Sequence, residues 1–155
     1  MTEQPTAPVA TATLAPPLPF PDHIRAYLAE TRFATMSTID PDGMPRHAVI
    51  WYRLDGDEIV LNSAVGRRWP ANLVRDPRMA LSVLDATDGY RWVGLTGVVE
   101  AVTDRDATQA DIAEMCRRYH ADDPAEAERI VRERFERQDR ISFRFRATSI
   151  HDHLA

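Results

Sequence analysis

Apolar residues gather in five short runs in the middle of the chain. These runs are rich in β-branched and aromatic residues, and sequences containing Asp, Gly and Pro separate them. Connections this short favour antiparallel pairing of the flanking strands. The pattern therefore predicts five antiparallel strands, within residues 32–39, 44–53, 58–63, 78–85 and 90–102.

A sixth run, "RISFRFRA" at residues 140–147, alternates strictly. Its apolar residues fall at positions 141, 143 and 145, and its polar residues fall at positions 142, 144 and 146. Successive side chains of a strand point to opposite faces of the sheet. This run therefore predicts a strand with one buried face and one exposed face.

Helical spacing replaces the strand pattern in three other stretches. Within residues 21–32, Asp22 is a candidate N-cap, and Ile24 and Leu28 share a helix face. Two further helices follow residue 103; a candidate capping box at Asp106 and Gln109 precedes the first. The second has its start signal at residues 123–126. The apolar stripes are Ile112, Met115, Cys116 and Tyr119 in the first, and Ala127, Ile130, Val131 and Phe135 in the second.

Together the elements indicate a mainly β fold, because the strands do not alternate with helices as in β-α-β proteins. Six antiparallel strands with a few helices predict a small β-barrel with helices at its ends. We assign residues 20–155 to this one domain. Residues 1–19 are rich in Pro, Thr and Ala, and we interpret them as a flexible arm.

Composition excludes several classes of function. No apolar run approaches the roughly 18 residues that a membrane-spanning helix needs, so we expect no membrane insertion. The net charge of -5, with arginines and acids interspersed near the C-terminus, argues against nucleic-acid binding. The single cysteine excludes an internal disulfide, and with no basic signal segment it indicates a cytoplasmic protein. All 19 basic residues are arginine, which suggests a high-GC bacterial source.

The familiar catalytic motifs, among them GxSxG, the P-loop, GxGxxG and HExxH, do not occur in the sequence. Cys116 lies on an apolar helix stripe, where a buried cysteine is a better interpretation than a nucleophile. His151 and His153 are a weak candidate metal pair, and we interpret them as part of a solvated tail. We therefore expect no metal site.

The stretch "GRRWPANLVRDPR", Gly66 to Arg78, is the strongest candidate for chemistry. Arg67 and Arg68 stand at the start of a predicted helix, where the positive end of the helix dipole disfavours cations. Free backbone N–H groups and two guanidinium groups at one place suit an anion such as phosphate, with Asn72 as a further donor. The alternative is a solvated turn.

The segment from Phe33 to Glu100 resembles the flavin- and deazaflavin-dependent oxidoreductases of the pyridoxamine 5'-phosphate oxidase-like family. The resemblance lies in the order of its signals: a "DPDG" turn, a strand ending "VIWY", a "DGD" turn, a strand ending "NS", the "GRR..ANL..DPR" loop and "DGYRWV..TG". It implies a six-stranded antiparallel split β-barrel of the FMN-binding kind. It also implies a homodimer with two cofactor sites at the subunit interface and hydride-transfer chemistry on a small-molecule substrate.

Site residues follow from the resemblance position by position. Those that match cofactor-binding positions are His47, Val49, Ile50, Trp51, Ser63, Arg67, Arg68, Trp69 and Asn72. Tyr90 and Trp92 match aromatic positions near the substrate pocket. Trp69 stands where the family usually has a phosphate-facing lysine. Either Arg68 supplies that charge, or Trp69 stacks on a ring, or the site has changed or lost its cofactor.

The branch of the family that this loop resembles uses the deazaflavin coenzyme F-420 of actinobacteria, and the arginine-only composition agrees with that source. The first hypothesis is therefore a cytoplasmic, dimeric F-420-dependent reductase of a small unsaturated or conjugated substrate. An FMN- or FAD-dependent relative is the second hypothesis. A flavin- or haem-binding protein of the same fold without catalysis is the third.

Overall fold

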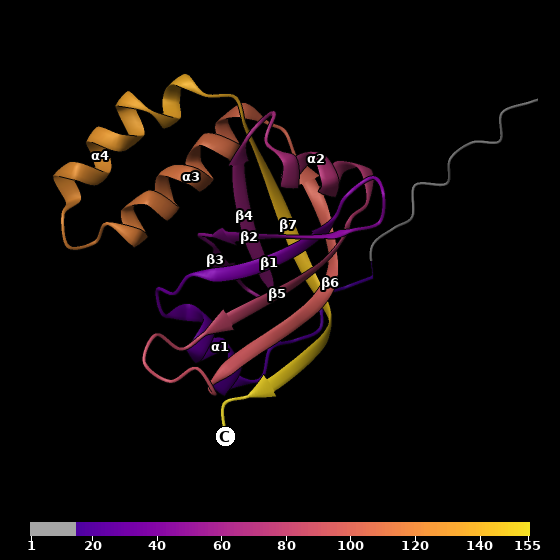
Figure 1. Cartoon of the computed structure of the whole chain (residues 1–155). Helices are drawn as coiled ribbons and strands as arrows, with labels where there is room; N and C mark the ends of the chain where they lie inside the picture. Colours follow the sequence, from indigo (N-terminus) through magenta and orange to yellow (C-terminus); the bar gives the residue numbers. More distant parts are fainter. Residues whose placement is uncertain (1–14) are drawn as a thin grey trace, which may run out of the picture.

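A computed structural model describes residues 15–155 as one antiparallel sheet of seven strands with four α-helices. The strands follow the order β2-β1-β5-β6-β7-β4-β3 across the sheet. They are β1 (Ala34–Ile39), β2 (Pro45–Ile50), β3 (Arg53–Asp55), β4 (Glu58–Ala64), β5 (Arg78–Leu84), β6 (Trp92–Val102) and β7 (Arg140–His153). The helices are α1 (Asp22–Ala29), α2 (Arg68–Arg75), α3 (Arg105–Tyr119) and α4 (Pro124–Glu133), followed by the short 3-10 helix η1 (Phe135–Arg137). Figure 1 shows their arrangement.

The prediction of a mainly β, antiparallel fold is confirmed, but the sheet has seven strands where the sequence predicts six. The additional strand is β3, a segment of three residues that pairs with β4. Within the described residues the edge strands β2 and β3 do not pair with each other, so the sheet is open and the predicted six-stranded barrel is not confirmed.

Glycines with positive φ make the turns that the sequence predicts. Gly43, with φ of 87°, closes the β1–β2 hairpin by donating its N–H to the carbonyl of Asp40. Gly56 serves the β3–β4 reversal with φ of 61°, and Gly66 joins β4 to α2 with φ of 94°. A side chain at these φ values is strained, which explains glycine at all three positions.

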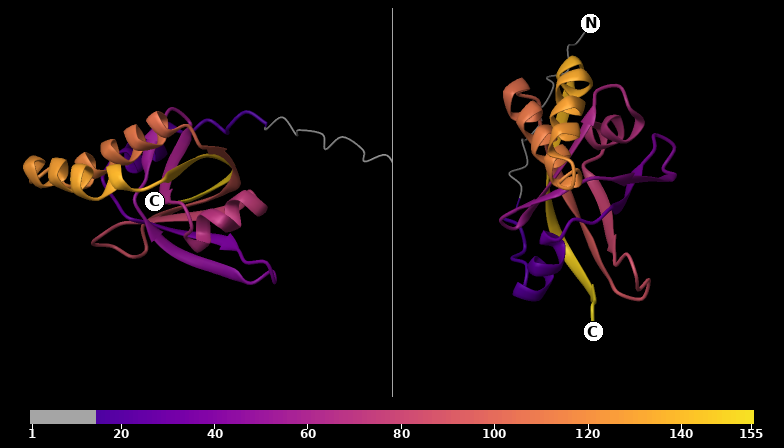
Figure 2. Two further views of the ribbon diagram at one scale, coloured as in Figure 1. Left: turned by 90° about the horizontal axis from the view of Figure 1, so that it is seen from above. Right: turned by 90° about the vertical axis from the view of Figure 1, so that its left-hand side faces the viewer.

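The main core lies inside the curved sheet and is covered at one end by α1. Ile24 and Leu28 of α1 are fully buried there, as their shared helix face predicts. Met36, Leu81 and Phe143 contribute from β1, β5 and β7. A second apolar cluster lies between β4 and the α3–α4 pair, and it includes the buried Cys116. Figure 2 shows α3 and α4 side by side, extending beyond the sheet.

Strand β7 is longer and more buried than predicted. The α3 helix packs on the face that was expected to be exposed, and Ser142 there is fully buried, donating to Asp111 at 2.7 Å. Strand β7 pairs with β6 from Ser142 to His153, which brings His153 opposite Trp92. His151 and His153 are exposed, as predicted, but they belong to a strand and stack on Trp92, so the prediction of a free tail is wrong.

Helix starts agree with the sequence in one case and differ in two. The Asp123 side chain accepts from the N–H of Glu126 and caps α4, as predicted. For α3 the N-cap is Asp104, whose carboxylate accepts from the N–H of Ala107, and not the predicted Asp106. Asp22 is the first residue of α1 and not its N-cap, which is Pro21.

The predicted arm at residues 1–19 lies mostly outside the described residues, which begin at residue 15. Residues 15–19 form no regular element, and the N–H of Leu18 donates to the carbonyl of Ala147 on β7. Phe20, the first residue of the predicted domain, is buried in the main core.

Candidate functional site

The candidate loop leads directly from β4 into α2. Gly66 turns the chain, Arg67 is the N-cap residue in an extended conformation, and α2 begins at Arg68. The N-cap makes no side-chain hydrogen bond to the helix. An uncapped helix start leaves backbone N–H groups without partners inside the helix, and the anion site at this end of α2 stays a prediction.

Arg68 and Asn72 turn away from that site toward Asp40 in the β1–β2 hairpin. Arg68 Nε lies 3.1 Å from Asp40 Oδ1, and Asn72 Nδ2 donates to the same oxygen at 2.9 Å and to Thr38 at 3.0 Å. The hydrogen bond from Asn72, followed by the hydrogen bond and charge of Arg46 and the charge of Arg68, lowers the pKa of Asp40 to about 2. These two predicted phosphate ligands therefore fasten α2 to the hairpin.

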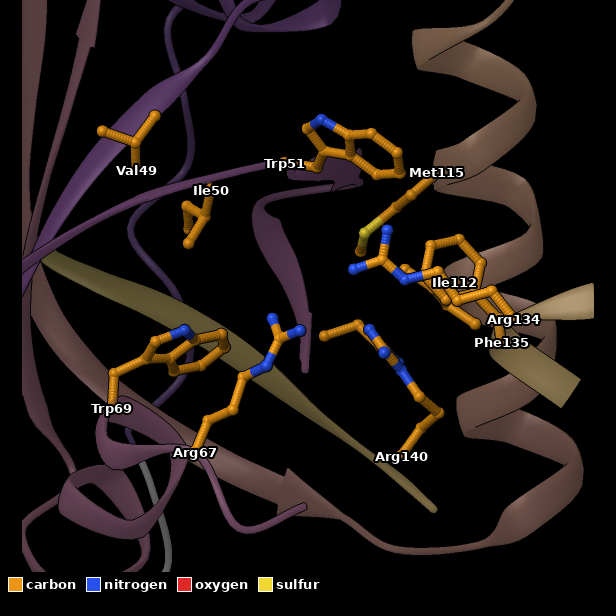
Figure 3. A pocket seen from close by; sticks show the side chains of 11 residues that line it. Val49, Ile50, Trp51, Arg67, Trp69, Ile112, Met115, Arg134, Phe135 and Arg140 are labelled. Carbon is orange, nitrogen blue, oxygen red and sulfur yellow. The ribbon is translucent and has the colours of Figure 1, made fainter. Parts of the chain in front are cut away.

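Arg67 points the other way, into a cavity of about 220 Å³ between the end of β2, the start of α2 and the base of the α3–α4 pair. We call this cavity the arginine pocket, because Arg67, Arg134 and Arg140 all line it. Figure 3 shows their three guanidinium groups directed toward the same space, from three different segments of the chain.

None of the three arginines forms an ion pair within residues 15–155, and no carboxylate lines the pocket. Arg140 is only 7% exposed, and its guanidinium donates to the neutral amide oxygens of Asn62 at 2.8 Å and Gln138 at 2.5 Å. Burial, with smaller contributions from the nearby Arg67 and Arg134, lowers the pKa of Arg140 to about 10. The pocket is thus a region of concentrated positive charge.

Apolar and aromatic side chains form the remaining walls. Val49, Ile50 and Trp51 line the pocket from the end of β2, while Trp69 lines it from the first turn of α2. Trp51 is fixed by a stack on Tyr119, with ring centroids 5.0 Å apart and planes 7° from parallel. The opposite wall consists of Ile112, Met115 and Phe135.

Trp69 is held between the core and the pocket. Its ring centroid lies 5.8 Å from that of Phe143, at an angle of 50°, and the indole packs against the main core while lining the pocket. A cation at this position would have to leave the apolar contact with Phe143. The packing therefore accounts for an aromatic residue at this position.

Five of the predicted cofactor-binding residues, Val49, Ile50, Trp51, Arg67 and Trp69, come together around the pocket. The others do not line it. Besides Arg68 and Asn72, Ser63 is buried in β4 and donates to the carbonyl of Ala64, while His47 is exposed on β2 with its Nδ1 3.2 Å from Ser37 Oγ.

The two predicted substrate-pocket residues lie far from the arginine pocket within one chain. Trp92 pairs with His153, whereas Arg140 begins the same strand, so the two are separated by most of the length of β7. At about 3.3 Å per residue this is roughly 40 Å along the strand. Tyr90 lies in the loop before β6 and is 85% exposed. A single small cofactor does not reach both regions of one chain.

Sequence reasoning missed Asn62, Arg134 and Arg140. Arg134 and Arg140 belong to a segment in which arginines alternate with acids, a pattern typical of a solvated surface. Asn62 is in the "NS" ending of a strand that was correctly predicted, but only its neighbour Ser63 was assigned a role. Arg140 fits the polar phase of the strictly alternating last strand, so the strand pattern does not mark it as a site residue either.

The weaker chemical candidates remain structural. Cys116 is buried, and burial raises the pKa of its thiol, as expected for a packed cysteine. Across residues 15–155 we find no cluster of three or more His, Cys, Asp or Glu side chains suited to a metal ion. The same part of the chain contains no helix that is long and apolar enough to cross a membrane.

Comparison with known proteins gives one match to a family model. The model described as Pyridoxamine 5'-phosphate oxidase matches residues 20–153. A search of curated protein sequences found no match.

Solved structures share the fold. A structure named F420 reductase is 24% identical with a TM-score of 0.67, covering 85% of this chain and 98% of that one. A conserved hypothetical protein from Mycobacterium tuberculosis is 25% identical with a TM-score of 0.70, covering 92% of this chain and 91% of that one. A haem storage protein from Vibrio cholerae is 14% identical with a TM-score of 0.62, and the match covers 84% of this chain and 92% of that one.

Proposed function

Because this chain belongs to the pyridoxamine 5'-phosphate oxidase family, we propose that it is an oxidoreductase that binds coenzyme F-420 in the arginine pocket. Its substrate is a small unsaturated or conjugated molecule, and it works in the cytoplasm. The observation that carries the proposal is the pocket itself, in which three arginines without carboxylate partners in the described chain face an aromatic and apolar wall. This donor set fits a cofactor with an anionic end and a flat ring.

The arginine and the apolar residues of the pocket bind different parts of the cofactor in this proposal. Arg67 binds the phosphate, together with the free N–H groups at the start of α2. Val49, Ile50 and Trp69, which line the pocket, would hold the ring. The bound deazaflavin supplies the hydride, so the protein needs neither a nucleophile nor a metal for this chemistry. Its residues orient the ring and exclude water.

The proposal includes a homodimer. Trp92 starts β6 opposite the far end of β7 from Arg140, and Tyr90 precedes it in the loop, so an aromatic contact from these positions to a pocket has to come from a second copy. Val49, at 70% exposed, and Tyr90, at 85% exposed, are large apolar groups that a partner subunit would cover. Light scattering at micromolar concentration should give twice the mass of the chain. A monomer at every concentration would contradict a site shared between subunits.

Two alternatives remain within the family. One is an enzyme that uses FMN or FAD in the same pocket. The other is a non-catalytic flavin- or haem-binding protein, favoured by the named haem storage protein among the structures of this fold. Titration of the purified protein with F-420, FMN, FAD and haem, followed by fluorescence or absorbance, separates these cases. We expect F-420 to bind most tightly of the four. If haem bound more tightly than F-420, the protein would instead be a non-catalytic haem-binding member of the family.

Trp69→Lys tests whether the tryptophan contacts the ring. We expect F-420 binding to weaken by about 1 kcal/mol, because an aromatic contact of roughly that strength is lost. Trp69→Phe keeps an aromatic ring against Phe143 and should bind within about threefold of the wild type. Fluorescence titration measures both. If Trp69→Lys bound F-420 more tightly than the wild type, position 69 would instead be a phosphate contact that this chain has lost.

A further inference from the structure

The arginine pocket holds more positive charge than one phosphate neutralises. Its lining contributes three guanidinium groups and no carboxylate, and none of the three is ion-paired within residues 15–155. A phosphate monoester, as in FMN, carries about -1.5 to -2 charges at neutral pH, and the phosphodiester of F-420 carries about -1. With three cations around the phosphate, roughly one positive charge is left without a counter-charge for a monoester and about two for a diester.

The excess charge is located on the side of the pocket away from α2. Arg67 enters from the α2 loop, whereas Arg134, which follows α4, and Arg140, at the start of β7, enter from the other side of the pocket (Figure 3). Arg134 is exposed, and its guanidinium carbon lies 5.6 Å above the ring of Phe135, so the side chain rests on an apolar surface. Its N–H groups are therefore available to a ligand.

Arg140 is held in a fixed orientation by neutral groups. Asn62 Oδ1 accepts from Nε at 2.8 Å, while the amide nitrogen of Asn62 donates to the Thr108 carbonyl and to Ser142 Oγ, both at 2.9 Å. Both ends of the Asn62 amide are thus in use, which fixes the oxygen that faces Arg140. An arginine that is more than nine-tenths buried with only amide acceptors remains a full positive charge in need of an anion.

We propose that Arg134 and Arg140 form a second anion-binding subsite, distinct from Arg67, that takes a carboxylate or phosphate group. The inference rests on the proposed function in one respect: the anion at Arg67 is taken to be the phosphate of the cofactor. The second anion has two sources: a carboxylate tail of the cofactor, as in F-420, or a separate anionic substrate. FMN, which has one phosphate and no carboxylate, binds without filling this subsite.

The test uses Arg134→Gln, because Arg134 is exposed and its replacement leaves the core intact. Arg132→Gln is the matched control, since Arg132 is an exposed arginine of α4 that does not line the pocket. Calorimetry measures citrate binding to each protein without cofactor at low salt, and fluorescence measures the dissociation constants of F-420 and FMN. Arg134→Gln should weaken citrate binding by about fivefold or more, while Arg132→Gln should leave it unchanged.

The cofactor measurements identify the source of the anion. Loss of about fivefold in F-420 affinity, with FMN changed by less than about twofold, identifies the cofactor tail. If neither cofactor changes and citrate still binds the FMN-loaded wild type, the anion belongs to a separate substrate. Equal weakening of FMN and F-420 would overturn the subsite, because Arg134 would then bind the single phosphate. The subsite would also be overturned if Arg134→Gln left F-420 affinity unchanged and citrate bound none of the three proteins. The same holds if citrate bound the wild type, Arg134→Gln and Arg132→Gln equally.

These results do not depend on turnover. If the wild type binds no flavin or deazaflavin, the proposed function fails, but citrate binding that depends on Arg134 would still establish the subsite. Conversely, full F-420 binding and activity in Arg134→Gln, with citrate binding unchanged, would leave the function intact and remove the subsite.

Discussion

Arg67→Ala is expected to weaken binding of F-420 by about 1.5 to 3 kcal/mol, the range for a hydrogen bond to a charged group. Arg67 lines the pocket and is not ion-paired within the described residues, so its guanidinium is available to a phosphate. Raising the salt concentration should weaken wild-type binding in the same direction through screening. Fluorescence titration at two ionic strengths measures both effects.

Arg68→Ala is the matched control, because it removes the same group from the neighbouring residue. The sequence alone predicts an equal effect for both arginines. In the structure Arg68 Nε is bonded to Asp40, so we expect its loss to change cofactor affinity by less than about 0.5 kcal/mol. Equal losses in the two variants would mean that Arg68 leaves Asp40 when the cofactor binds.

Gly97→Ala is expected to lower the free energy of unfolding by about 3 kcal/mol, the upper part of the range for overpacking. Gly97 lies at the irregularity in the pairing of β6 with β7, and a Cβ there would be 2.0 Å from the carbonyl oxygen of Arg146. The obstacle is backbone, which cannot move aside as a side chain can. For a chain of this size the midpoint of thermal unfolding should fall by about 10 °C.

Gly89→Ala is the comparison for this substitution. A Cβ at Gly89 would meet no heavy atom within 4 Å, and the residue has no positive φ, so alanine should change stability by less than about 0.5 kcal/mol. Urea unfolding of both variants separates the close backbone contact from a general effect of replacing glycine. A Gly97→Ala protein as stable as the wild type would show that the strands shift apart at little cost.

The turns and long strands were predictable because their signals are local. An "Asp-Pro-Asp-Gly" sequence closes a hairpin wherever it stands between two apolar runs, and Gly43 adopts the positive φ that such a turn requires. The three-residue strand β3 was missed because it is too short to show a period. The burial of Ser142 was missed because it depends on α3, which packs there from 31 positions away in the sequence, as its bond to Asp111 shows.

The residues of the candidate site also divide into those with a local sequence signal and those that only the fold brings together. Arg67 and Trp69 were found because they belong to one contiguous loop with a recognisable pattern. Arg134 and Arg140 were missed because only the return of the chain from α4 into β7 brings them to that loop. The direction of Arg68 was also beyond the sequence, since its partner Asp40 lies 28 residues away in a hairpin.

The central claim is that the arginine pocket binds the phosphate of a flavin or deazaflavin cofactor through Arg67. The most direct measurement compares phosphate-bearing cofactors with their phosphate-free counterparts: FMN with riboflavin, and F-420 with its deazaflavin core. In the wild type, the phosphate-bearing member of at least one pair should bind about tenfold more tightly, and in Arg67→Ala that ratio should fall below about three. Equal affinities within both pairs, or a ratio that Arg67→Ala leaves unchanged, would contradict the account.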